Sequence, residues 1–367
     1  MVTIATLGSH SALDVCDGAK AEGFKTLVVA QKKREQTYSK YYKTRKRGKS
    51  EIGIVDETLV LDKFADITKK ENIAYLKKKD SVFVPNRSFS VYVGNDNIEK
   101  NFPIPLFGNR FLLKAEERNV ERNQYFLMEE ARIDTPRRIP TPDRITKLCI
   151  VKVSEATRSY ERAFFLASTY EDYMEKSQKL IGDGIITKTG LESARIEQFV
   201  VGAQFNFNFF YSPLTQELEL LGIDTRRQTN LDGLLHMTAD VQLEALKQMR
   251  TSNIEIGHLA STIRESFLED VFKAGERMVE VCRHEYKPGI IGPFALQCAI
   301  TEESSKDNKG REELVVFDVS FRMPGSPGTR FTPYSSYLFR EPVSFGKRIA
   351  MEIKEAQKQK RMDEITT

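Results

Sequence analysis

The chain has 367 residues, which is too long for one ordinary hydrophobic core and indicates two or three packed units. Hydrophobic residues make up 40% and charged residues 29%, as in a globular protein, and a net charge of +4 does not favour nucleic acid as a partner. No apolar run approaches the roughly 18 residues of a membrane helix, and the first residues lack the basic region of a signal peptide. We therefore expect a cytoplasmic protein that binds neither nucleic acid nor membrane.

The first hundred residues alternate between short apolar strands and helices. The turn Gly8-Ser9-His10 follows the first strand and leads into an amphipathic helix that ends at Gly23. The predicted strands cover residues 2–7, 26–30, 58–61 and 81–84. A strand–helix–strand unit of this length predicts a parallel sheet, so residues 1–108 should form a Rossmann-like, doubly wound domain.

One basic stretch lies within this region, at residues 43–49. A nucleic-acid patch and a solvated loop both fit its charge. No aromatic or glycine-rich pattern continues it, which favours the loop.

The middle of the chain predicts a linker helix over residues 112–131 and a proline-rich connector over residues 135–142. A small α/β unit follows, with a strand over 148–153, a hairpin partner over 163–167, a helix over 170–181 and a strand over 194–201. We expect residues 109–202 to form the linker helix and a separate lid.

From residue 203 onward the strands become longer and more aromatic. They are predicted at residues 205–211, 217–224, 294–300 and 314–319, the last two joined by a polar hairpin over residues 302–311. Apolar residues at helical spacing from Ile263 to Val281 predict one long amphipathic helix, and residues 343–358 predict a closing helix. Residues 203–367 should therefore form a mixed-sheet domain, and the overall class is α/β with α+β character.

Two groups of polar residues follow predicted strands in the N-terminal part. At Gly8-Ser9-His10 the backbone N–H groups and the dipole of the next helix would favour an anion such as phosphate. At Pro85 to Phe89, Arg87 and Ser88 would lie beyond a strand end, where ligands bind in open α/β sheets. An ordinary capped turn is the alternative at both places.

Lys152 closes a lid strand, where it can neutralise nucleotide phosphates. The strand Glu197 to Val200 can offer a backbone N–H and a backbone C=O to an adenine edge. Gln297 and Asp318 lie on neighbouring strands of one hairpin, so their oxygens can face one Mg²⁺ ion.

Residues 318, 320 and 322 share one strand face, which would bring Arg322 to a triphosphate. A polar surface hairpin is the alternative. The histidines at positions 236, 258 and 284 lack metal-ligand spacing and are interpreted as surface or packed residues.

Seven segments, in order along nearly the whole chain, resemble those of the archaeal formate-dependent AICAR ligases, the FAICAR synthetases (PurP) of the ATP-grasp superfamily. The segments are Thr3-Ile-Ala-Thr-Leu-Gly-Ser-His10, Gly18-Ala-Lys-Ala-Glu-Gly-Phe24, Phe107-Gly-Asn-Arg110, Tyr211-Ser-Pro213, Glu219-Leu-Leu-Gly-Ile-Asp224, Asn230-Leu-Asp-Gly233 and Ile291-Gly-Pro-Phe294.

This resemblance implies an ATP-grasp fold in which ATP lies between the lid and the C-terminal domain. ATP would phosphorylate formate, and the 5-amino group of AICAR would attack the formyl phosphate to give FAICAR, ADP and phosphate in IMP synthesis. The implied partners are AICAR and formate, and the implied cofactors are ATP and Mg²⁺, with Mn²⁺ as the alternative ion. A closed homo-oligomer is the usual form of such enzymes.

Site residues carry over by position. The AICAR contacts would be Ser9, His10, Ser88 and Asn230. The ATP contacts would be Lys152, Glu197, Gln198, Phe199 and Val200. Gln297 and Asp318 would hold the metal, and His10 and Arg322 would be the catalytic residues.

The chain departs from the family pattern at the expected site. Asn86-Arg87 replaces His-Gly, Asp318 replaces Glu, and Arg330 replaces Asn. The loop 154–162 has no glycine for cradling phosphates, so Arg158 or Arg162 would have to replace that backbone cradle. Two alternatives therefore stay open: an ATP-grasp paralogue that uses another acid or amine, and a non-catalytic purine-nucleotide-binding protein.

Overall fold

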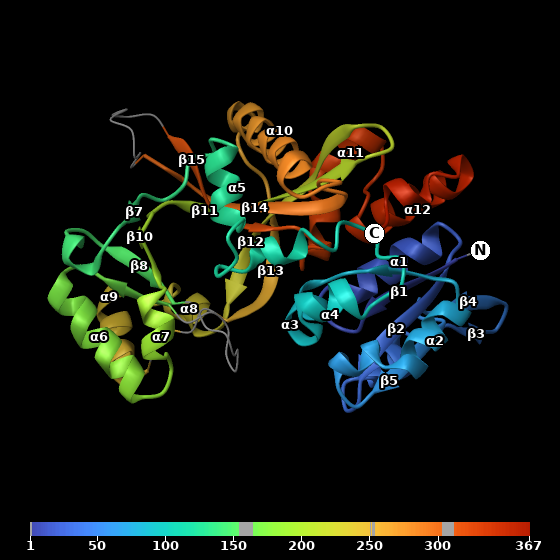
Figure 1. Ribbon diagram of the computed structural model, residues 1–367, viewed down its shortest axis with the longest axis horizontal. Coiled ribbons are helices and arrows are strands. Elements are labelled where there is room, and N and C mark those ends of the chain that lie inside the picture. Colours follow the sequence, from blue (N-terminus) through green and yellow to red (C-terminus); the bar gives the residue numbers. More distant parts are fainter. Residues whose placement is uncertain (1, 154–163, 250, 252–253, 303–311) are drawn as a thin grey trace.

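The computed structural model describes residues 2–153, 164–249, 251, 254–302 and 312–367 (Figure 1). It contains a four-stranded parallel sheet, a four-stranded lid sheet, a five-stranded sheet and a small hairpin. Within the described residues, no helix combines the length and the apolar character needed to span a bilayer.

The N-terminal sheet is parallel, as predicted, with the strand order β5-β2-β1-β6. Its strands are β1 (Thr3–Leu7), β2 (Lys25–Gln31), β5 (Glu57–Leu61) and β6 (Ser81–Val84). Its helices are α1 (Ala12–Ala21), α2 (Lys70–Lys78), α3 (Arg87–Val93) and α4 (Asn95–Lys100). Every residue of β1 and β6 is buried, which explains why both read as unbroken runs rather than alternating patterns.

The basic stretch is not a loop. It forms an exposed hairpin of β3 (Arg45–Arg47) with β4 (Ser50–Ile52). Its arginines and lysines face solvent.

The predicted linker helix over residues 112–131 is divided. A 3₁₀ turn covers Leu113–Glu116, and α5 (Gln124–Glu130) begins only after Asn123. The Asn123 side chain accepts hydrogen bonds from the backbone N–H groups of Tyr125 and Phe126, at 3.0 and 3.3 Å. An asparagine with extended backbone is a strong N-cap, so it starts a new helix here.

The lid sheet has the antiparallel order β7-β10-β8-β9. Its elements are β7 (Arg138–Ile139), β8 (Cys149–Lys152), β9 (Phe164–Ala167), β10 (Arg195–Gln198), α6 (Tyr170–Gly182) and α7 (Lys188–Glu192). Val151 and Ile196 pack with the helices on one face, so Lys152 and Glu197 alternate onto the other face. The predicted strand over 194–201 ends at Gln198, and Phe199 and Val200 follow it.

The C-terminal sheet has the order β13-β12-β11-β14-β15. It was predicted to be mixed, but every pairing in it is antiparallel. Its strands are β11 (Ala203–Ser212), β12 (Glu217–Gln228), β13 (Glu255–Ser261), β14 (Gly292–Thr301) and β15 (Glu313–Ser320). The helices of this region are α8 (Thr229–Leu234), α9 (Ala239–Gln248), α10 (Leu268–Glu285), α11 (Pro333–Phe339) and α12 (Phe345–Gln359). α5 and α10 cover the apolar face through Phe207, Phe209 and Leu296.

The first and last long helices cross in close contact. A Cβ atom on Gly18 of α1 would lie 2.0 Å from the carbonyl carbon of Gly346 in α12, and a Cβ on Gly346 would lie 1.8 Å from the carbonyl oxygen of Asp14. Only glycine fits at either position. The Gly346 N–H also donates to the Asp14 carboxylate at 3.2 Å, so this crossing joins the N-terminal sheet to the C-terminal part of the chain.

A buried ion-pair network lies beside the same crossing. Arg348 of α12 donates two hydrogen bonds to Glu219, at 2.7 and 2.8 Å, and one to Glu352 at 2.8 Å. Ser212 donates to the other oxygen of Glu352 at 2.6 Å. The guanidinium also stacks 4.2 Å from the ring centre of Phe210. All three charged residues are at least 93% buried, so each depends on the others for solvation.

Candidate active site

The ends of β1 and β6 bring two serines together. The Ser88 hydroxyl at the start of α3 donates to the Ser9 hydroxyl at 2.7 Å. Asn86 holds this corner, since its amide donates to the backbone oxygen of Leu7 at 2.9 Å and its oxygen caps α3. The backbone N–H groups of Gly8 and Ser9 donate to Val29 and Leu7. An anion here would therefore be bound by side chains rather than by those two N–H groups.

His10 lies beside a residue pair from β13. A Cβ atom on Gly325 would lie 3.0 Å from His10 Nδ1, 3.3 Å from His258 Nε2 and 3.7 Å from a Glu255 oxygen. The His10 ring is accessible to solvent, but the surrounding protein still removes water from it and thereby lowers its pKa; Glu255 opposes this effect. His10 is therefore a neutral imidazole near pH 7, with a ring nitrogen free to accept a proton.

His258 is held between two carboxylates. Its Nδ1 contacts Asp224 of β12 and its Nε2 lies 2.9 Å from Glu255. Although burial opposes the charged form, the two hydrogen bonds and charges raise the pKa of His258 to about 9. The pKa of Glu255 falls to about 2, because His258 and Arg226 outweigh its burial. The site therefore pairs a charged His258 with a neutral His10.

The raised pKa of His258 predicts a loss of stability in alkali. The folded pKa of about 9 exceeds the unfolded value of 6.5, so the stabilisation is complete below pH 6.5 and is lost as pH rises through 9. We expect this group to account for up to about 3 kcal/mol of unfolding free energy between these limits. Denaturant unfolding at a series of pH values measures it. The His258→Gln variant should show a flatter profile, and an unchanged profile would contradict the assignment.

Four polar residues form a line across the C-terminal sheet. Asp224 pairs with Asn206, Asn206 with Gln297, and Gln297 with Asp318, each directly across neighbouring strands. All four are at least 92% buried. Because strand side chains alternate, this polar row lies opposite the apolar face that packs on α5 and α10.

The polar row holds the two residues that were predicted to bind a metal. Asn206 and Asn208 donate to the Asp224 carboxylate at 2.8 and 2.6 Å, so that acid is already engaged. Gln297 Oε1 is buried and accepts no hydrogen bond from the described residues, although its amide lies 3.5 Å from the Ser320 hydroxyl. A buried amide oxygen beside a carboxylate suits a hard cation that completes its shell with phosphate and water oxygens. Among the described residues, no three His, Cys, Asp or Glu side chains form a metal cluster by themselves.

Lys152 lies in a buried polar contact between the lid and the C-terminal sheet. Its ammonium group is 2.6 Å from a Glu197 oxygen, 3.2 Å from the Tyr125 hydroxyl and 3.3 Å from the backbone oxygen of Phe317 in β15. Arg195 binds the other oxygen of Glu197. The predicted ATP residues of β8 and β10 are thus neighbours in space.

Arg322 and Asn230 lie outside the groups of residues described so far. Arg322 lies beyond the end of β15, not on its face, and pairs with Glu116 at 3.2 Å. It is still close enough to affect the pKa of His10. Asn230 lies in α8, and the hydrogen bonds that join Ser9, Ser88 and Asn86 do not include it. The roles of both residues stay predictions.

Two departures from the family pattern have structural explanations. Asn86 caps α3 and supports the turn after β1. Arg330 pairs with Asp17 of α1 at 3.1 Å. The loop 154–162, with Arg158 and Arg162, lies outside the described residues, as does most of the predicted hairpin over 302–311.

Sequence reasoning missed Asn206, Asp224, Glu255 and the position of His258. A signal for the first of these was present, because Asn206 and Asn208 alternate with phenylalanines in a strand that is otherwise aromatic. Polar residues at every second position of such a strand indicate a polar face.

Comparison with known proteins places this geometry in context. Residues 4–139 match a family described as "Protein of unknown function (DUF1246)", and residues 172–367 match one described as "Domain of unknown function (DUF1297)". Two similar relatives, from Methanopyrus kandleri and Methanocaldococcus jannaschii, are both named 5-formaminoimidazole-4-carboxamide-1-(beta)-D-ribofuranosyl 5'-monophosphate synthetase. The first is 37% identical over 100% of this chain and 95% of its own length, and the second 38% identical over 99% and 94%.

Two solved structures are also similar to this chain. An IMP biosynthesis protein PurP from Thermococcus kodakaraensis is similar with a TM-score of 0.71 and 28% identity, over 99% of this chain and 100% of its own. An N5-carboxyaminoimidazole synthetase from Staphylococcus aureus, complexed with ADP, has a TM-score of 0.56 and 12% identity, over 89% and 72% of the two chains. The second likeness concerns the fold alone.

Proposed function

Because the chain belongs to the 5-formaminoimidazole-4-carboxamide ribonucleotide (FAICAR) synthetase family of ATP-grasp ligases, we propose that it formylates AICAR with formate and ATP. ATP would phosphorylate formate, and the AICAR amino group would displace phosphate from the formyl phosphate. The observation that carries this proposal is the convergence of His10, Ser9 and Ser88 on one side with the polar row on the other.

The acceptor side would bind the purine intermediate. The paired hydroxyls of Ser9 and Ser88 offer donors to an anion at the end of β1, where ligands bind in open sheets. His10 has a lowered pKa, so its neutral ring would accept the proton that the amino group loses during attack. The charged His258, fixed by Asp224 and Glu255, would position Glu255 beside His10.

The phosphoryl side would use the lid and the polar row. Lys152 would exchange its contact with Glu197 for ATP phosphate oxygens. The N–H groups of Gln198 and Phe199 already donate to Arg137 and Leu148, so the remaining backbone groups of residues 197–200 would face adenine. Gln297 and Asp318 would hold a divalent cation, Mg²⁺ or Mn²⁺, which would neutralise phosphate charge. Arg322 would stand near the transferred group, and Asn230 would contact AICAR. Enclosure by the lid would keep water from the acyl phosphate.

A coupled assay for ADP tests the proposal. Purified protein with ATP and Mg²⁺ should release ADP only when formate and AICAR are both present, and FAICAR should form in equal amount. Omission of either substrate is the control. ADP release with another carboxylate but not with formate would contradict the proposal.

The substitutions around the site favour one alternative, a paralogue that uses another acid or amine. Arg87 lies beside Arg322 and Glu116 in a small cavity near the acceptor side, where the family has glycine. This cation could select a different acid. A panel of carboxylates in the same assay separates the two functions. If ATP binds by calorimetry and no acid releases ADP, the protein is a binding protein.

We also infer that the chain forms a homo-oligomer. The segment from α8 to β13 exposes large hydrophobic side chains, with Leu235, Leu243 and Ile256 each at least 65% exposed. No residue of α9 is buried. Exposed apolar surface of this kind is typical of a protein interface. Light scattering should give a multiple of the 42.0 kDa chain mass, and a monomer at all concentrations would contradict the inference.

A further inference from the structure

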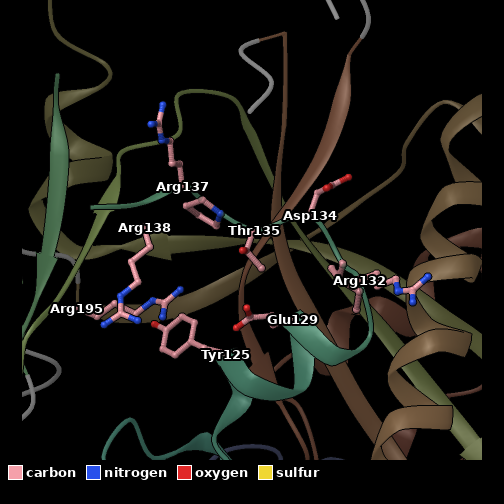
Figure 2. Close-up of a pocket in the computed structure, with 10 residues that line it drawn as sticks. Tyr125, Glu129, Arg132, Asp134, Thr135, Arg137, Arg138 and Arg195 are labelled. Atoms are coloured by element: carbon pink, nitrogen blue, oxygen red, sulfur yellow. The ribbon is translucent and has the colours of Figure 1, made fainter. Parts of the chain in front are cut away.

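A cavity of about 620 Å³ opens between α5, the segment that follows it and the β7–β10 edge of the lid (Figure 2). Its walls are fixed by the fold. The backbone N–H of Val316 donates to the oxygen of Asp134 at 2.8 Å, and that of Gln198 donates to the oxygen of Arg137 at 2.9 Å. The segment between α5 and β7 is therefore bound to both sheets, and the cavity is a built feature.

The cavity is positively charged. Its charged lining residues are Arg132, Arg137, Arg138, Arg195, Glu129 and Asp134, so cations outnumber acids by two. Figure 2 shows Arg138 and Arg195 extending towards the same part of the cavity, beside Tyr125. In the part of the chain that the structure describes, Arg138 makes no ion pair. Arg195 is already paired with Glu197, so an anion between the two arginines would supply the charge partner that Arg138 lacks.

The lining suits a phosphate ester better than a simple ion. Guanidinium groups present forked donors that match phosphate oxygens. Glu129 and Thr135 add groups that can bond sugar hydroxyls (Figure 2). The volume lies in the range of small-molecule sites and exceeds what a lone phosphate fills.

This cavity is separate from the proposed ATP site but in contact with it. Tyr125 lies between the cavity and the ATP site. On the cavity side, Arg195 stacks 3.9 Å from the ring centre of Tyr125, and on the other side the Tyr125 hydroxyl accepts a hydrogen bond from Lys152. Glu197 joins them, since its two oxygens hold Arg195 and Lys152. Lys152 itself does not line the cavity.

We infer that this cavity binds a phosphate monoester of sugar-phosphate to nucleotide size, and that its occupancy weakens ATP binding. A ligand phosphate would compete with Glu197 for Arg195. Glu197 would then hold Lys152 more strongly, so Lys152 would be less available to ATP. The coupling is reciprocal, so bound ATP would lower the affinity of the cavity for the phosphate monoester by the same factor.

Ribose 5-phosphate is a suitable probe for calorimetry. The titration is made without AICAR, because that nucleotide belongs to the ligand class that the cavity would bind and would fill it. Ribose 5-phosphate should bind with millimolar affinity or better, whereas ribose should not bind, and the Arg138→Gln variant tells binding in the cavity apart from binding at the proposed acceptor site. Arg138→Gln should weaken binding at least about tenfold. Arg144→Gln is the matched control, because Arg144 is exposed and its one ion pair among the described residues is with its neighbour Asp143.

The Kd for ATP tests the coupling between the cavity and the ATP site. Ribose 5-phosphate should raise the Kd for ATP in the unmodified protein and in Arg144→Gln, but not in Arg138→Gln. Equal probe affinity in Arg138→Gln, or no binding at all, would overturn the site, and an unaffected Kd for ATP would overturn the coupling. Failure of AICAR to support ADP release would count against the proposed function alone, since the cavity titration is made without AICAR.

Discussion

Asp318→Asn should lower the rate of ADP formation by roughly two to three orders of magnitude without unfolding the protein. The side chain keeps its shape but loses its charge, in a row where Gln297 is its direct cross-strand neighbour and both are buried. A neutral amide would bind a divalent cation much more weakly than a carboxylate. Steady-state rates measured over a range of Mg²⁺ concentrations would report this change.

Asp270→Asn is the matched control for this variant. Asp270 lies in the first turn of α10 and is exposed, so the same chemical change there should leave turnover within about twofold of the unmodified protein. Circular dichroism should show the native fold in both variants. Unchanged turnover in Asp318→Asn would remove Asp318 from the metal site.

Arg348→Met should destabilise the protein by about 3 to 5 kcal/mol. Methionine fills similar volume but leaves Glu219 and Glu352 as buried, uncompensated charges. Burial already raises the pKa of Glu219, although Arg348 opposes that effect. Without the arginine Glu219 would take up a proton more readily, so the deficit should shrink as pH falls from 7 towards 5. Urea unfolding at the two pH values measures both effects.

Lys354→Met provides the comparison on the same helix. Lys354 is exposed and pairs with Glu22 of the turn after α1 at 2.9 Å. Exposed ion pairs contribute about 0 to 1 kcal/mol, so this variant should remain close to the unmodified protein at both pH values. If Arg348→Met were equally mild, the network would be irrelevant to stability.

Local patterns predicted most of the buried strands but missed β3, β4, β7 and β13. The buried strands β1 and β6 lack an alternation of apolar and charged residues, and β14 and β15 follow each other along the chain, so their pairing follows from adjacency. That pairing brought Gln297 and Asp318 together as predicted. The family resemblance is also confirmed, by relatives that align over nearly the whole chain.

Contacts between distant segments could not be predicted in this way. His258 meets Asp224 because β13 pairs with β12, yet α8 and α9 separate the two strands in sequence. The division of the helix before Tyr125 depended on one capping side chain, Asn123, that outweighed helical spacing. The cavity at Arg138 and Arg195 arises where two segments 57 residues apart meet, and neither segment has a recognisable motif.

The crossing of α1 and α12 restricts how this sequence can drift. Positions 18 and 346 already hold glycine, so a larger side chain at one of them cannot be compensated by a smaller side chain at the other. At most core contacts a larger side chain at one position can be accommodated by a smaller one at the other, but neither glycine can be replaced by a smaller residue. A lineage that lost either glycine would have to separate its first and last helices. It would thereby shift the turn that carries His10 relative to the strands that carry Gln297 and Asp318, so selection on the reaction also acts on two residues that touch no substrate.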